Sequence, residues 1–390
     1  MAKSNMTTKR ETVASVLQRR RPERIVYAPN YWQWFTHQFN HGLLPEEIRH
    51  CAIQLDLIRH LGLDVFSRNL YCDPTQYWFG GLADQVCDGV ELKIERRAEG
   101  KDLLTERTFH TRRGALTERL RYVFSESTLV QEKFLIDDPA TQLDAFEELV
   151  RGRRWRFNRE LYGRWERDVG GDGLLNAGEL FSPLKMLHLA AGAADAVFLI
   201  EDFPDRCREL CTIHEAAQLD LVRQMLEAGV LAMIAMDNLD SAFHPPRYLE
   251  GYSASFYERA ARLCRETGST FFIHACGHQR AILPLVASLG VDGLEGVAFP
   301  PLGDVQLDEA MRLTGDRFII TGGISAMQTE QFRCYDEVRE YVENLFARLR
   351  PYSHRFIFSS SCNTSILSPW PVLKWFRDAW QELGVAGRCW

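Results

Sequence analysis

Apolar residues in the second half of the chain fall into short continuous runs separated by longer amphipathic stretches. The runs are VLAMIAMD, TFFIHAC, VDGLEGV, RFIITGG and RFIFSSSC, and segments such as PPRYLEGYSASFYERAARLCRETG between them have helical periodicity. Strands that are apolar on both faces are typical of a parallel sheet covered by helices. Counted from RIVYAP near the amino terminus, there are about eight such strands, which predicts an α/β protein with a (β/α)8 TIM barrel.

The first half of the chain follows the same scheme with one interruption. Residues 8–18 are predicted to form a helical extension before the first strand, residues 45–61 a helix with an apolar stripe, LDVFSRN the second strand, and LLNAG a short third strand. Between Gly89 and Lys133 apolar and polar residues alternate, which predicts a β-hairpin or meander inserted at about residues 89–135. We therefore expect a single domain over residues 1–390.

The composition narrows the class of protein. Of 390 residues, 46% are hydrophobic and 25% are charged, and the formal net charge is -7, which argues against a nucleic-acid partner. No apolar run reaches the ~18 residues of a membrane span, and the first ten residues, MAKSNMTTKR, lack the apolar centre of a signal peptide. We therefore predict a cytoplasmic protein that does not bind a membrane, with its ten cysteines reduced.

The clearest candidate chemistry lies at the end of the run TFFIHAC. His274 and Cys276 are two positions apart, so they point to the same side of a strand. Imidazole nitrogen and thiolate sulfur are ligands that zinc prefers, and Cys362 at the end of RFIFSSSC supplies a second thiol. A packed histidine next to a buried thiol is the alternative interpretation. Asp237 and Glu295 also fall at strand ends, where barrel enzymes carry their chemistry.

An aromatic cluster lies in PNYWQWFTHQF, close to the first predicted strand. Tyr31, Trp32 and Trp34 are candidates for the wall of a substrate pocket, and rings of this kind can hold a methylated cation. A place in the core or at an interface is the alternative for the same residues.

The order of several weak motifs resembles that of the uroporphyrinogen decarboxylase superfamily, closest to its zinc-dependent methyltransferases that work with corrinoid proteins. The motifs are TKRETVASVLQRRRPERIVYAP, LGLDV, the strand-end Asp237, HACG, DGLEGVAFPPLGDVQLDEAMRLTGDRFIITGGI and SSSCNTSILSP. Decarboxylases of this superfamily have arginines near the amino terminus that bind substrate carboxylates, whereas PNYWQWFTHQF has none. The His-x-Cys pair and distant cysteine of the methyltransferases match His274, Cys276 and Cys362.

The resemblance implies a zinc ion held by His274, Cys276 and Cys362, with Glu250 or Glu295 completing its ligands in the resting state and the fourth position open to a substrate. Asp237 is expected to hold a substrate or an imidazole N–H, or alternatively to cap the following loop. His278 and His244 are candidates for substrate contact, and an exposed loop histidine is the alternative interpretation for both. Glu295 and His278 join Asp237 as the candidate catalytic residues.

The implied reaction is methyl transfer between a small methylated compound or thiol and a corrinoid bound to a partner protein, or a tetrahydrofolate-type acceptor. A metal-independent decarboxylase and a non-catalytic binding protein on the same fold are the alternatives. The sequence is equally consistent with a monomer and a homodimer.

Overall fold

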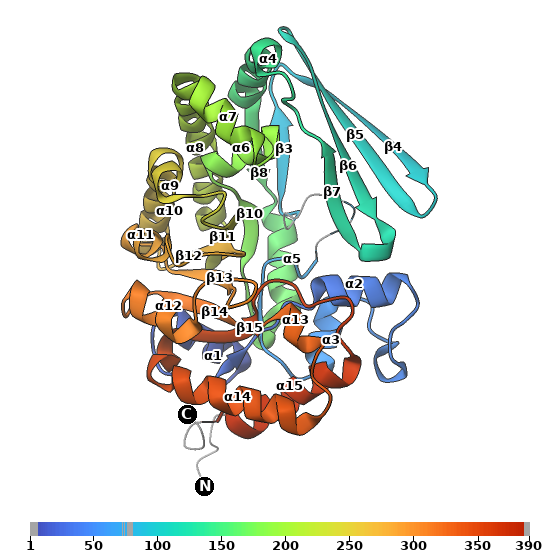
Figure 1. Cartoon of the computed structure of the whole chain (residues 1–390), viewed down its shortest axis with the longest axis vertical. Coiled ribbons are helices and arrows are strands. Elements are labelled where there is room, and N and C mark those ends of the chain that lie inside the picture. The colour runs from blue at the N-terminus through green and yellow to red at the C-terminus, as the bar shows by residue number, and fades with distance from the viewer. Residues whose placement is uncertain (1–6, 72, 74, 76–80, 386–390) are drawn as a thin grey trace.

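A seven-stranded parallel sheet forms the centre of the computed structural model, which describes residues 7–71, 73, 75 and 81–385 (Figure 1). The strand order is β1-β15-β14-β13-β12-β11-β10. These strands are β1 (Val26–Tyr27), β10 (Ala177–Leu180), β11 (Ala232–Leu239), β12 (Thr270–Ala275), β13 (Gly293–Val297), β14 (Ile319–Ile324) and β15 (Phe356–Ser360). A second parallel pair consists of β2 (Val65–Ser67) and β9 (Gly173–Leu175).

The two parallel sheets surround a common core. Only Asn176 separates β9 from β10, and the Asp64 N–H donates to the Tyr27 carbonyl at 3.0 Å, which links β2 to β1. One cluster of buried side chains draws on both sheets and on α1 (Lys9–Leu17): Val13, Val16, Leu17, Val26, Ala28, Phe66, Leu174, Ala232, Ile234, Met236, Phe272, Ile319 and Ile357. The fold is therefore α/β and TIM-barrel-like. Among the described residues no ladder of strand pairs joins the two sheets, so closure of the barrel stays a prediction.

Helices pack against the strands through apolar faces. On α10 (Ala254–Glu266), Phe256, Ala260 and Cys264 recur at helical spacing and are buried on the side of β12. The other helices are α2 (Trp32–Asn40), α3 (Gln54–His60), α4 (Pro139–Gly152), α5 (Arg159–Val169), α6 (Pro183–Ala191), α7 (Asp195–Asp202), α8 (Pro204–Glu227), α9 (Pro246–Tyr252), α11 (Leu283–Ser288), α12 (Leu307–Thr314), α13 (Ala326–Thr329), α14 (Tyr335–Leu349) and α15 (Trp370–Leu383). Short 3-10 turns are η1 (Glu46–Ile48), η2 (Phe124–Glu126), η3 (Gly170–Asp172) and η4 (Arg350–Arg355).

The helix predicted over residues 45–61 is divided into η1 and α3. The carboxylate of Asp56 accepts hydrogen bonds from the backbone N–H groups of Ala52 at 2.9 Å and Ile53 at 3.2 Å. These bonds satisfy N–H groups at a helix start, so a new helix begins after Ile53 instead of continuing from η1.

An antiparallel meander occupies the interruption between β2 and α4. Its strands are β4 (Glu91–Glu99), β5 (Asp102–Thr111), β6 (Gly114–Val123) and β7 (Thr128–Lys133), paired in sequence order. In Figure 1 this sheet projects from the upper right of the molecule, away from the parallel strands. A further antiparallel pair, β3 (Ala83–Cys87) with β8 (Arg153–Phe157), flanks it and was not predicted.

No single helix among the described residues has the length and apolarity of a membrane span. One bent pair, Pro183–Ala191 with Asp195–Asp202 at 114°, meets the length and composition test only when its two helices are taken together.

Candidate functional site

Polar side chains at the carboxyl ends of the parallel strands form a layer next to the apolar core. Residues two apart on a strand share a face, so Arg68 follows Phe66 and His274 follows Phe272 on the inner side. The parallel register pairs His274 of β12 with Glu295 of β13. The site is therefore built from inward-facing positions directly beyond the core.

Four side chains from four strand ends form a continuous buried network. The Arg68 Nε donates to the Glu295 Oε2 at 3.0 Å, and the same carboxylate oxygen contacts the His274 Nδ1. The other ring nitrogen, His274 Nε2, lies 3.8 Å from the Cys362 Sγ. Arg68, Glu295 and His274 are only 8%, 6% and 2% exposed, so water screens these contacts weakly.

A second thiol, that of Cys276, completes this network. Cys276 directly follows β12, and its N–H donates to the Leu239 carbonyl at 3.0 Å, which anchors the residue beside β11. Its thiol lies close enough to the thiol of Cys362 for each to affect the pKa of the other. The Cys362 thiol, together with the charge of Arg68, lowers the pKa of Cys276 to about 7 although burial opposes this. The Cys276 thiol and burial raise the pKa of Cys362.

The positive charges of Arg68 and His274 keep the Glu295 carboxylate ionised. Burial alone would raise the pKa of Glu295, but Arg68 and His274 lower it to about 2. Burial and Arg68 disfavour the imidazolium form of His274, whereas Glu295 and Cys362 favour it, and the net effect is a raised pKa. Glu295 is thus an ionised acceptor that orients the imidazole so that Nε2 points at Cys362.

Two glycines allow the strand ends to approach each other. Gly277 has φ +89°, and a Cβ there would lie 1.9 Å from the Asp240 Oδ2. Gly296 has φ +88°, and its Cβ would lie 2.9 Å from the carbonyl oxygens of Ala275 and Ser361. At Gly296 a side chain would push the strand carrying Glu295 away from its neighbours, and at Gly277 it would displace the Asp240 carboxylate and strain a backbone with positive φ next to Cys276.

The donors His274, Cys276 and Cys362 suit zinc in type, and the separation of His274 from Cys362 suits it as well. A nitrogen at ~2.1 Å and a sulfur at ~2.3 Å from a tetrahedral zinc are about 3.6 Å apart, and the His274–Cys362 separation is 3.8 Å. Among the described residues, however, no group of three or more His, Cys, Asp or Glu side chains is already arranged as a metal site. Binding of an ion would therefore require an adjustment of the side chains, and zinc stays a prediction.

The other predicted polar residues lie outside this network. Asp237 is buried and accepts from the Ser182 N–H at 2.8 Å and from the Tyr257 hydroxyl. His244 is buried in the loop before α9, Glu250 is exposed on α9, and His278 is 54% exposed with its Nδ1 3.6 Å from the Asp240 Oδ2. Of the polar candidates other than the three donors, only Glu295 contacts His274 in the described part of the chain.

The aromatic candidates are placed on or next to α2. Tyr31 and Trp34 are 2% and 1% exposed. The Tyr31 hydroxyl is 3.0 Å from that of Tyr27, while Trp34 stacks on Trp370 and donates to the Ser368 carbonyl at 2.9 Å. These are core contacts. Trp32 is partly exposed, and a substrate role for the three residues stays a prediction.

Sequence reasoning missed Arg68, Lys185 and His188. Arg68 directly follows β2 near the end of LDVFSRN. A charged residue two positions after the inward-facing Phe66 is the signal that could have marked it. Lys185 and His188 lie in an apolar stretch that predicts a helix, but its sequence does not indicate where that helix packs.

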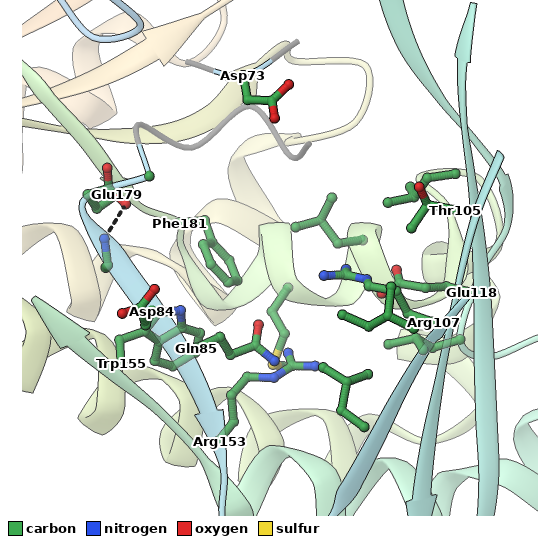
Figure 2. A pocket seen from close by; sticks show the side chains of 18 of the residues that line it. Asp73, Asp84, Gln85, Thr105, Arg107, Glu118, Arg153, Trp155, Glu179 and Phe181 are labelled. Atoms are coloured by element: carbon green, nitrogen blue, oxygen red, sulfur yellow. Dashed lines mark hydrogen bonds and ion pairs between the residues drawn. The ribbon is translucent and has the colours of Figure 1, made fainter. Parts of the chain in front are cut away.

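A separate cavity of about 570 Å³ lies between the meander, the β3–β8 pair and α6 (Figure 2). Figure 2 shows Glu179 on one side of it and Arg107 and Glu118, which form an ion pair, on the other. Burial raises the pKa of Glu179 to about 7, although its carboxylate accepts from the N–H groups of Leu82 at 2.9 Å and Ala83 at 3.1 Å. No described residue that lines this cavity belongs to the His274 network.

The sequence and the structure have relatives among known proteins. The family model described as Uroporphyrinogen decarboxylase (URO-D) matches residues 171–383, more than half of the chain. The search of curated proteins found none that matches this chain. The structure is similar to that of a methyltransferase from Methanosarcina mazei, with a TM-score of 0.60 and 14% identity over 96% of this chain and 99% of that chain. A D-psicose 3-epimerase from Clostridium cellulolyticum H10, solved with D-tagatose, is more distant, with a TM-score of 0.35 and 11% identity over 58% of this chain and 83% of that chain.

Proposed function

The chain belongs to the uroporphyrinogen decarboxylase (URO-D) family, and on this premise we propose that it is a zinc-dependent methyltransferase. It moves a methyl group between a small methylated compound or thiol and a corrinoid carried by a partner protein, or a tetrahydrofolate-type acceptor. The proposal takes the parallel strands as a closed (β/α)8 barrel with the site at its carboxyl-terminal face.

The buried juxtaposition of one imidazole with two thiols carries the proposal. A decarboxylation that proceeds without metal has no need of a cysteine 3.8 Å from a buried histidine nitrogen. The similarity to a methyltransferase from Methanosarcina mazei over 96% of this chain supports the same activity.

The residues of the network have distinct roles in this proposal. His274, Cys276 and Cys362 hold the zinc. When bound, zinc supplies a Lewis acid that favours the deprotonated form of a thiol or the departure of a leaving group. Glu295 keeps the imidazole in the tautomer with its proton on Nδ1, which leaves Nε2 free to bind metal. Arg68 holds Glu295 ionised and in place.

Metal analysis of the purified protein tests the proposal. After incubation with zinc and removal of excess, the wild-type protein should retain about one equivalent per chain. Cys276→Ser and Cys362→Ser should each lose it, whereas Cys334→Ser, at an exposed cysteine remote in sequence from the network, should retain it. Full zinc content in both of the first two variants would contradict the proposal.

A second candidate is a metal-independent decarboxylase, which the family description and the arginines of the cavity in Figure 2 favour. Arg107, however, is already neutralised by the buried Glu118, which makes it a poor partner for substrate carboxylates. Turnover of a carboxylated tetrapyrrole that is insensitive to chelators would establish this candidate and exclude the first.

A further inference from the structure

Three nitrogen-bearing side chains meet near the carboxyl end of β11, apart from the His274 network. Lys185 and His188 are three residues apart on α6 and so lie on one face of that helix. His244, from the loop that leads to α9, packs against His188 with ring centroids 4.8 Å apart and ring planes at 70°. The two histidines are 7% and 2% exposed.

These three side chains make no well-formed hydrogen bond within the described part of the chain. Neither enclosed ring nitrogen of His244 makes a well-formed hydrogen bond, although the Asp240 backbone carbonyl lies near one of them. The Lys185 ammonium and the His188 ring take part in no hydrogen bond or ion pair there. A neutral imidazole has one N–H donor and one acceptor, so each ring keeps at least one polar atom without a well-formed hydrogen bond. Buried polar groups are rarely left this way unless a ligand or water fills the space.

The charge of Lys185 favours an anion over water as the group bound at this cluster. Burial lowers the pKa of Lys185, yet Asp237 and Cys276 lie close enough for their charges to raise it. Burial and the neighbouring Lys185 charge lower the pKa of His188 to about 3, so this ring is a neutral donor. Asp237 forms no ion pair with this ammonium, and its carboxylate accepts from the Ser182 N–H and the Tyr257 hydroxyl. An ammonium and two imidazole rings therefore lie together without a carboxylate hydrogen-bonded to any of them among the described residues.

We infer that Lys185, His188 and His244 bind an oxyanion group of the substrate, such as a carboxylate. Because Lys185 lies near Cys276, a substrate held by its anionic end at this cluster presents its other end toward the His274 network. The inference rests on the proposed function for the identity of that other end, but the anion site itself does not depend on zinc.

Acetate is the simplest probe of this cluster. In the full-length protein labelled with 13C-histidine, acetate should shift the ring signals of His188 and His244 with saturation, both with and without zinc. In Lys185→Met the dissociation constant should rise at least about tenfold, equivalent to 1.4 kcal/mol, and Lys185→Arg should recover much of the loss. Lys374→Met, which removes a partly exposed lysine that pairs with Glu47, is the matched control and should bind like the wild type.

The outcomes separate this inference from the proposed function. Saturable shifts that depend on Lys185 support the anion site even if the protein binds no zinc. Absence of any shift in folded wild-type protein at about 0.1 M acetate, or equal affinity in Lys185→Met, would overturn it and leave buried water as the occupant. If Lys185→Met does not fold, His244→Gln can be compared with the wild type instead. It retains an N–H donor but removes the ring, so its affinity for acetate should be reduced less than that expected for Lys185→Met.

Discussion

Replacement of Arg68 by methionine should weaken both the fold and the metal affinity of the site. The change removes the guanidinium 3.0 Å from the Glu295 Oε2 while it preserves much of the apolar stem. Glu295 then remains buried with His274 as its remaining partner in the network. Its pKa is lowered from 4.5 to about 2, a change that corresponds to about 3 kcal/mol of favourable interaction. Loss of one partner of a buried pair costs about 3–5 kcal/mol, so we expect a loss of about 3 kcal/mol.

Urea denaturation and competition with a metal chelator measure the two effects. Zinc affinity should fall about 10–100-fold, because the imidazole loses its fixed orientation. Arg24→Met is the matched control, since Arg24 binds the buried Asp64 through two contacts of 2.6 Å in a different part of the molecule. It should lower stability comparably and leave zinc affinity unchanged. In a Glu295→Gln background, Arg68→Met should lower the free energy of unfolding by less than it does in the wild type, because no carboxylate remains to be neutralised.

The pH dependence gives an independent check. Glu295 has a lowered pKa in the folded protein, so its ion pair stabilises the fold above about pH 4.5, and this contribution is lost as the pH falls toward 2. The difference in unfolding free energy between the wild type and Arg68→Met should therefore shrink on acidification. If Arg68→Met has wild-type stability, or binds zinc no more weakly than Arg24→Met, Arg68 does not hold Glu295 and His274 in place.

Three further substitutions give separate tests. Gly277→Ala should destabilise the protein and weaken metal binding, because its Cβ would lie 1.9 Å from the Asp240 Oδ2 and φ is +89°; thermal unfolding equal to wild type would contradict this. Glu179→Gln should be more stable than the wild type at about pH 8 but not at about pH 5. The pKa of Glu179 is raised to about 7, so ionisation of this buried carboxyl costs the wild-type protein up to about 3 kcal/mol of unfolding free energy between pH 4.5 and 7. An equal stability difference at both pH values would exclude this cause. Trp34→Phe should lower the free energy of unfolding by about 1–3 kcal/mol, because the hydrogen bond to Ser368 and the stacking on Trp370 are lost. A changed KM at unchanged stability would instead favour the predicted substrate role.

Much of the fold was accessible from local patterns. The near-continuous apolar runs predicted the parallel strands from β11 to β15, and the alternation after Gly89 predicted the antiparallel strands that follow β3. The split of the helix over residues 45–61 was not accessible, because it depends on Asp56 turning back to cap two N–H groups. The β3–β8 pair was missed because its partners are far apart in the chain and the two short segments lack a distinctive pattern.

Local sequence was enough to predict which residues face inward at the strand ends, since alternation along a strand is a local property. His274, Cys276 and Glu295 could be named on that ground. Which side chains contact one another depends on the folded arrangement. Arg68 and Glu295 are 227 positions apart in the chain, and His274 and Cys362 are 88 apart. Asp237 binds Ser182 and Tyr257 instead of an imidazole. The physical reason is that such contacts depend on the order and curvature of the whole parallel sheet and on the helices that pack against it, which no local pattern encodes.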